Sequence, residues 1–181
     1  MRLQFMIIAL IASLLTLLGA REAAAQLLPA QASRQPLYVV PGADGHEFIA
    51  FSPRSGELQR YRFPKTIQPK LIDTTECAVF DLSGGVITEL VAVDQHGRFV
   101  KHGIKPTQDR LLIKAIGAKA VVVVNGEIHA FSALTGTWAT LRSDGDPVLG
   151  DSVILVRTGK EVAFYSETTG RWAIAPLAGN P

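Results

Sequence analysis

One short pattern occurs four times along the chain, and it limits the fold more than any other feature of the sequence. Each copy begins with glutamate, continues through apolar residues to a Ser or Asp, and then enters a turn that contains glycine. The copies lie at residues 47–58, 89–99, 127–138 and 161–172. Their leading glutamates are 42, 38 and 34 residues apart, and a period of about 40 residues is typical of propeller blades. Residues 37–181 are therefore predicted to form one array of four similar units.

Within each copy the residues have the spacing of a strand, in which alternate side chains face opposite sides. In the third copy, Ile128 and Ala130 share one face and Phe131 lies on the other. Both faces are apolar, which predicts that each small sheet is covered on both sides by its neighbours. The fold class is predicted to be all-β, a β-propeller-like array of four repeats of 34–42 residues. A two-sheet sandwich is the alternative.

Further strands complete each unit. In the third unit we expect strands at residues 111–116, 120–124, 127–132 and 137–141, and in the fourth at 148–149, 153–157, 161–166 and 171–175. Asn125-Gly126 is a strong signal for a two-residue hairpin, because both positions need a positive φ. The second unit is the weakest match, since its turn is one residue shorter. A strand within residues 27–40 that pairs with the last unit is a candidate for closing the array.

The turn glycines of the four copies are predicted to adopt a positive φ after a Ser or Asp that bonds to its own turn. They are Gly56, Gly97, Gly136 and Gly170. This interpretation makes them structural residues rather than functional ones.

Two of the copies resemble a known repeat. Residues 131–138 (FSALTGTW) and 165–172 (YSETTGRW) resemble the end of a kelch-type propeller repeat, in which an aromatic residue, a polar turn and a Trp close each blade. The Thr-Gly turn is also similar to that of periplasmic propellers with quinoprotein-like repeats. The resemblance implies a propeller and carries over no catalytic residue, since fold does not imply function.

The first residues have the layout of a secretory signal. Arg2 is followed by an apolar stretch over residues 5–20, and Ala23-Ala24-Ala25 is a suitable peptidase site. Residues 1–25 are thus predicted to be a signal peptide cleaved after Ala25, and residues 26–36 a flexible leader. The alternative is an uncleaved anchor, but a spanning helix needs about 20 apolar residues. We expect a secreted or periplasmic protein without stable membrane insertion.

Composition excludes some classes of function. Without residues 1–25 the chain has 16 Lys and Arg against 15 Asp and Glu, a net charge of +1. Nucleic-acid binding would require a clustered basic face, so no nucleic-acid partner is expected. Cys77 is the single cysteine, and an intramolecular disulfide is therefore excluded. Cys77 begins an apolar run, which predicts a buried, inert thiol.

The candidate sites are few. A ring of four carboxylates around a central channel would suit a hard cation, and the weak candidate ligands for it are Glu47, Glu89, Glu127 and Glu161. The competing interpretation is that each glutamate begins a strand at the surface and is solvated or paired with Lys or Arg. The four histidines lack the tight spacing of a zinc site. Trp138 and Trp172 either cover the contacts between units or form a stacking platform for a sugar or peptide.

No catalytic residues and no cofactor are predicted, because neither a nucleophile elbow nor a phosphate-binding glycine loop occurs. The leading hypothesis is an exported binding or scaffold module that recognises a protein, peptide or polysaccharide through its loops. Two alternatives stay open: a small periplasmic hydrolase or lyase with acidic residues at a central channel, and a structural envelope component that acts as a homo-oligomer. The sequence also leaves open whether four repeats close alone or pair with a second chain.

Overall fold

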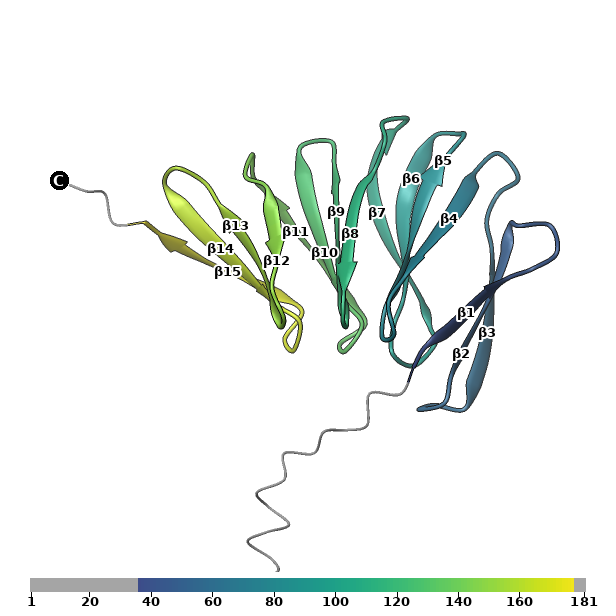
Figure 1. Ribbon diagram of the computed structural model, residues 1–181. Helices are drawn as coiled ribbons and strands as arrows, with labels where there is room; N and C mark the ends of the chain where they lie inside the picture. Colours follow the sequence, from purple (N-terminus) through teal and green to yellow (C-terminus); the bar gives the residue numbers. More distant parts are fainter. Residues whose placement is uncertain (1–35, 178–181) are drawn as a thin grey trace, which may run out of the picture. The chain divides into compact units, whose positions relative to one another are not determined.

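The structure, a computed structural model, describes residues 36–177 of the 181-residue chain. Within this range the chain forms four antiparallel sheets and no α-helix (Figure 1). The sheets follow one another in chain order, and each is built from consecutive strands. The first contains β1 (Tyr38–Pro41), β2 (Glu47–Ser52) and β3 (Glu57–Arg62); the second β4 (Gln68–Asp73), β5 (Ala78–Ser83), β6 (Ile87–Val93) and β7 (Phe99–Thr107); the third β8 (Leu112–Ile116), β9 (Lys119–Val124), β10 (Glu127–Ser132) and β11 (Thr137–Arg142); the fourth β12 (Pro147–Leu149), β13 (Val153–Arg157), β14 (Glu161–Ser166) and β15 (Arg171–Pro176). The all-β class and the four units are thus confirmed, and a two-sheet sandwich is not what these residues form.

Each copy of the repeated pattern supplies the last two strands of one sheet. In the first, third and fourth sheets these strands pair over six residues in the same register, with Glu47 opposite Arg62, Glu127 opposite Arg142 and Glu161 opposite Pro176. The second sheet departs from this register, because the pairing of β6 with β7 shifts between Ile87 and Glu89. The unit that matches the pattern least is therefore also the irregular one.

The turn predictions are confirmed. Asn125 and Gly126 have φ values of 55° and 70°, and the four turn glycines have φ values between 63° and 79°. A side chain other than Asn or Asp is strained in this region of backbone space. The pattern needs glycine at these positions because the two strands must reverse within a few residues.

Two faces can be defined for every sheet. The second, fourth and sixth residues of the pattern form the forward face, which in the first three sheets contacts the next sheet along the chain. The first, third and fifth form the backward face, which in the last three sheets contacts the preceding sheet. In β10, Ser132 lies on the forward face and bonds to Glu167 of the fourth sheet, whereas His129 lies on the backward face and contacts His102 of the second. In β10 five of the six residues are buried, so both faces of this sheet are covered.

The core lies between successive sheets. The first and second sheets meet through aromatic side chains, with ring centroids 4.7 Å apart for Phe48 and Phe80 and 5.3 Å apart for Tyr61 and Phe99. The third and fourth meet through a separate apolar cluster that includes Ile128 and Tyr165. Cys77 is fully buried, as predicted, and burial raises the pKa of its thiol. Contacts between sheets, rather than within one, hold the array together.

The first sheet has three strands where the others have four. The expected pairing of residues 27–40 with the last unit is wrong for the described part of that segment, because β1 pairs with β2 of its own sheet. The short connection of residues 42–46 favours this hairpin over any distant partner. The predicted signal peptide and nearly all of the leader lie outside the described residues.

No helix that is long and apolar enough to cross a membrane occurs among residues 36–177.

Candidate binding surface

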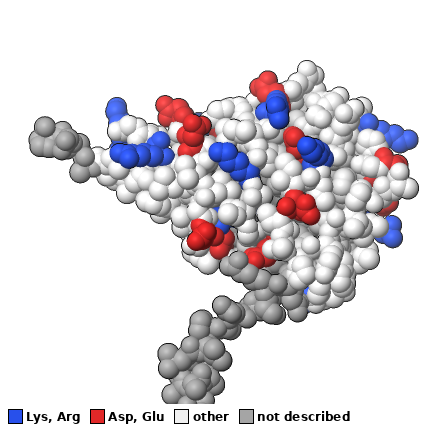
Figure 2. Space-filling model, in the orientation of Figure 1, with Lys and Arg blue, Asp and Glu red and all other residues white. Residues whose placement is uncertain are grey.

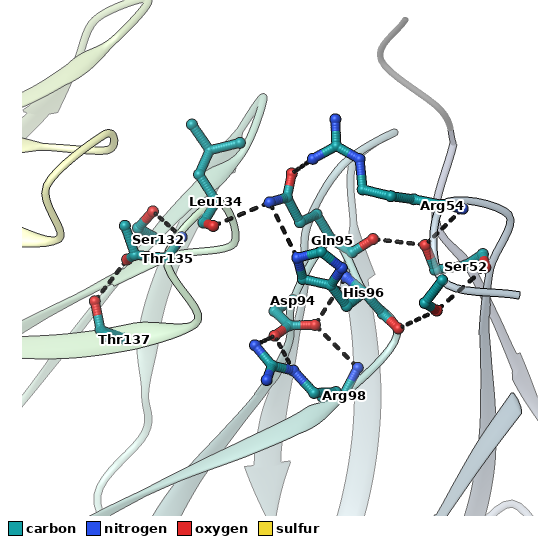
Figure 3. A network of polar contacts seen from close by, with 11 residues as sticks. Ser52, Arg54, Asp94, Gln95, His96, Arg98, Ser132, Leu134, Thr135 and Thr137 are labelled. Carbon is teal, nitrogen blue, oxygen red and sulfur yellow. Dashed lines mark hydrogen bonds and ion pairs between the residues drawn. The ribbon is translucent and has the colours of Figure 1, made fainter. Parts of the chain in front are cut away.

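In the first three sheets, the turn between the last two strands bonds to the turn of the next sheet, and Figure 3 shows this polar network in the turns of the first three sheets. The Ser52 hydroxyl donates to the Gln95 carbonyl at 2.6 Å. The Ser132 hydroxyl donates in the same way to the carbonyl of Glu167. In the first and third copies, the sixth residue of the pattern therefore joins neighbouring sheets in addition to bonding within its own turn.

The second sheet has Asp94 at this sixth position. The Asp94 carboxylate accepts hydrogen bonds from the His96 and Arg98 amides at 2.9 and 3.0 Å and forms an ion pair with Arg98 at 2.6 Å. Its side chain is fully buried, so these partners replace the water that a carboxylate would otherwise require. The shorter turn of this sheet is held by charge-assisted bonds where the others use a hydroxyl.

Gln95 connects three sheets. Its amide N–H donates to the Ala133 carbonyl at 3.1 Å, and its side-chain Nε2 donates to the Leu134 carbonyl at 3.0 Å. Its side-chain oxygen accepts a hydrogen bond from Arg54 of the first sheet. Because these bonds fix its side chain, the groups around it are held in place before any partner arrives.

We call the solvent-facing part of this network the turn surface. It comprises Arg54, Gln95, His96, Arg98, Leu134 and Thr135, all exposed or half-buried. Guanidinium, imidazole, amide and hydroxyl groups predominate, and such groups donate hydrogen bonds to carbonyl or carboxylate oxygens. Elsewhere, the face drawn in Figure 2 shows Lys and Arg interspersed with Asp and Glu on a largely uncharged surface.

A small apolar pocket lies near the start of β6, at the other end of the second sheet. Its lining includes Phe63, Ile67, Leu82 and Val86, and Glu89 lies at its edge. The Glu89 carboxylate is already occupied, since it accepts a hydrogen bond from the Tyr61 hydroxyl at 2.8 Å and pairs with Lys101 at 3.2 Å. The pocket suits an apolar side chain rather than a charged ligand.

The structure pairs three of the four candidate metal ligands with cations. Glu47 lies 3.7 Å from Arg60, Glu89 lies 3.2 Å from Lys101, and Glu127 lies 3.1 Å from Arg142. Glu161 is exposed at the start of β14. Within residues 36–177 no group of three or more His, Cys, Asp or Glu side chains is arranged to hold a metal ion. Three of the four carboxylates thus lie beside Lys or Arg.

Two histidines meet between the second and third sheets, a contact that the sequence analysis did not predict. His102 Nε2 lies 3.1 Å from His129 Nδ1, and the Thr140 hydroxyl lies 3.0 Å from the same His129 nitrogen. Burial, with the neighbouring His102, lowers the pKa of His129 to about 4. His129 Nε2 lies 3.9 Å from Glu127 and has no hydrogen-bond partner among residues 36–177. A hydroxyl, an imidazole and a carboxylate therefore lie near one another, but the distance from His129 to Glu127 is longer than a hydrogen bond.

The two tryptophans lie between sheets. Trp138 Nε1 donates to the Val100 carbonyl of the second sheet at 3.3 Å, and Trp172 Nε1 donates to the Ala139 carbonyl of the third at 3.2 Å. Both side chains are half-buried. Of the two roles considered for them, these contacts favour covering the interfaces between units.

A buried ion pair also joins the third and fourth sheets. Lys119 Nζ lies 3.0 Å from the Glu167 carboxylate, with the lysine side chain fully buried. Lys119 also donates to the Asp151 carbonyl. Sequence reasoning missed this pair because Lys and Glu are usually exposed, although Glu167 directly follows the Ser of the pattern.

Comparison with known proteins shows no family: no family model and no curated protein matches the chain. Among solved structures, BamB from Moraxella catarrhalis is similar over 78% of this chain and 47% of its own, with 18% identity and a TM-score of 0.36. A streptogramin B lyase structure is similar over 81% of this chain and 56% of its own, with 13% identity and a TM-score of 0.35. The chain thus spans about half the length of these two proteins.

Proposed function

We propose that the chain is an exported binding or scaffold module of the β-propeller class, with kelch-like or quinoprotein-like units. Its partner is an exported protein that presents a peptide segment to the turn surface. The observation that supports this most is the fixed position of the turn surface, in which Gln95 bonds to residues of the first and third sheets at once. A surface fixed in advance loses little conformational entropy on binding.

The chemistry of the turn surface suggests the kind of segment. Arg54 and His96 are donors at the surface and Leu134 adds an apolar contact. A peptide with an acidic side chain or exposed carbonyls would accept these donors, and an apolar neighbour would cover Leu134. A polysaccharide is less suited, since the turn surface contains no Trp, Tyr or Phe for a sugar ring to stack on.

Substitution of the donors tests the binding function. Crosslinking in the envelope, with a photoreactive residue in place of Thr135, should capture a defined partner. Arg54→Ala with His96→Ala should abolish that crosslink and leave the free energy of unfolding within a few tenths of a kcal/mol of wild type. The matched control is Lys70→Ala with Lys160→Ala, two cations outside the turn surface. Equal capture by the donor variant and the control would contradict the proposal.

Export has a separate test. We propose cleavage after Ala25, so that the mature protein begins at Gln26. Sequencing the N-terminus of the exported protein checks this, and Ala25→Leu should leave the precursor uncut, because the peptidase requires a small residue there. An unchanged N-terminus at Met1 in the exported protein would contradict it.

A further inference from the structure

The three interfaces between successive sheets share one set of contacts at their turns. Each uses the carbonyl of the first turn residue of the later sheet: Gln95, Ala133 and Glu167 accept hydrogen bonds from the sheet before them. The donors are the Ser52 hydroxyl, the Gln95 amide and the Ser132 hydroxyl. The residues at the sixth position, Ser52, Asp94 and Ser132, are at most 2% exposed.

The turn glycines of the later sheets also contact the turns of the sheets before them. A Cβ atom added to Gly97 would lie 3.3 Å from the Ser52 amide nitrogen, and one added to Gly136 would lie 2.9 Å from the Asp94 carboxylate. A Cβ on Gly170 would collide with the Thr137 and Thr135 hydroxyls. Each turn is therefore in close contact with the turn of the preceding sheet.

Each terminal sheet lacks one of these turn contacts: the fourth has none with a following sheet, and the first has none with a preceding sheet, among the described residues. Ser166, the sixth residue of the fourth copy, is half-buried, and among the described residues its hydroxyl bonds only to Thr168 of its own turn. Gly56, the turn glycine of the first copy, has open space where a Cβ would be added. The fourth sheet thus presents a forward face, and the first sheet a backward face, without the partner that every other copy has in residues 36–177.

The middle of each face is apolar, with arginines beside it: Arg60 and Arg62 on the first sheet, and Arg157 and Arg171 on the fourth. Phe51 lies on the backward face of the first sheet, and its register partners Tyr38 and Leu58 share that face. Tyr38 is 53% and Leu58 57% exposed. Phe164 lies on the forward face of the fourth sheet with its partner Leu155, which pairs in turn with Val148. Phe164 is 40% and Val148 60% exposed.

We infer that a second copy of this chain covers both faces. The forward face of the fourth sheet of one copy packs on the backward face of the first sheet of the other, as it does at the three interfaces within the chain. The Ser166 hydroxyl then donates to the Pro53 carbonyl of the other copy, the counterpart of the Ser132 bond to Glu167. One end face is a forward face and the other is a backward face. A second copy of the chain offers the complement of each, which identifies it as the partner.

The number of sheets limits the assembly to at most two copies. Two chains bring eight sheets together, within the usual range of about four to eight blades in a propeller, whereas three chains would exceed it. A dimer that closes at both ends has two such interfaces and buries twice the area of one. This favours a stable assembly, since a stable interface needs roughly 800 Å² on each partner. This inference depends on the repeated contacts between sheets and not on the proposed binding function.

Measurement of molar mass tests the inference. Size-exclusion chromatography with light scattering on the exported protein should give twice the mass of one chain at about 100 μM, falling toward one chain on dilution, as mass action requires. Val40 pairs with Ile49 on the backward face of the first sheet and is 52% exposed. Phe164→Glu and, separately, Val40→Glu should each give the mass of one chain at the same concentration. The control is Leu112→Glu, since Leu112 is 52% exposed but belongs to the third sheet. It should keep the wild-type mass.

Circular dichroism and the denaturation midpoint verify that each variant is folded, and Gly56→Asn provides a second route if a charged variant is not. Asn tolerates a positive φ, yet its side chain would fill the space that the other copy needs, so this variant should also have the mass of one chain. A wild-type mass of one chain, a mass above two chains, or a dimer that survives the end-face variants would each overturn the inference.

Discussion

β2 and β10 have nearly the same sequence and very different surroundings. β2 reads EFIAFS and β10 reads EIHAFS. In β10 the backward-face residue Phe131 is fully buried, whereas its counterpart Phe51 in β2 is 38% exposed. The pattern therefore specifies a strand that can be covered on both faces, and the neighbouring sheet decides whether it is. Each internal interface shows what an end face is built to contact.

Truncation of these two phenylalanines separates the environments most strongly. Phe131→Ala should lower the free energy of unfolding by about 3–5 kcal/mol, because it leaves a cavity between the second and third sheets. Phe51→Ala should lower it by about 1 kcal/mol, since that ring loses mainly its cross-strand contact with Tyr38. Urea denaturation of both variants, at concentrations where the chain is monomeric, measures the difference. Equal losses would mean that the first sheet is covered in the monomer.

Acid should weaken one internal interface in particular. The pKa of His129 is lowered from 6.5 to about 4 by burial, and by His102, against a smaller opposing effect of Glu127. Between these values the unfolded chain takes up a proton that the folded chain resists, so the free energy of unfolding falls as the pH is lowered from about 6.5 to about 4, by about 3 kcal/mol at most.

A matched variant isolates this effect. His129→Val introduces the residue type that Val91 supplies at the same position of the second copy. The variant should show a flatter dependence of the denaturation midpoint on pH between 4 and 6.5. An unchanged slope would show that other groups cause the acid sensitivity.

The turn glycines Gly170 and Gly56 allow a second comparison between a covered and an uncovered position. Gly170→Asn should destabilise the chain by about 1–3 kcal/mol, because the added atoms meet Thr135 and Thr137 of the third sheet. Gly56→Asn places the same side chain at the same φ but into open space, and should change stability by less than about 0.5 kcal/mol. Thermal denaturation of dilute samples compares them. The idea of close-packed turns fails if Gly170→Asn is as mild as Gly56→Asn.

The smallest expected difference concerns the serines. Ser132→Ala removes the donor to the buried Glu167 carbonyl and should cost about 1 kcal/mol. Ser166→Ala removes only a contact within one exposed turn and should cost a few tenths of a kcal/mol. The two denaturation midpoints, measured side by side, test whether the inter-sheet bond stabilises the array. A loss for Ser166→Ala as large as that for Ser132→Ala would contradict it.

Much of the fold could be predicted from the sequence because the signals are local. Alternating apolar residues and the Asn125-Gly126 turn determine strands and hairpins within a few residues, and the predicted range of β10 agrees with the structure to the residue. The four-fold repetition then indicated the number of sheets. The second unit was harder, since its short turn and the shift near Ile87 hide the pattern.

The candidate surface was harder to predict from the sequence, because its contacts join distant parts of the chain. Ser52 and Gln95 are 43 positions apart, and Lys119 and Glu167 are 48 apart. Each of these residues has an ordinary local interpretation, as a turn residue or a surface charge. His102 and His129 likewise meet only because successive sheets stack. Period and alternation predict each sheet but not which polar side chains meet across two of them.

Crosslinking between two differently labelled chains tests most directly whether the end faces meet as the internal ones do. Pro53→Cys is made in one chain and Ser166→Cys in another; Cys77 is buried, and its raised thiol pKa keeps it unreactive. Treated with a short bis-maleimide at a concentration that gives dimers, the mixture should yield a covalent dimer of the two chains, and neither variant alone should do so. If the mixture remains uncrosslinked while light scattering reports a dimer, the copies meet through some other surface and the account is wrong.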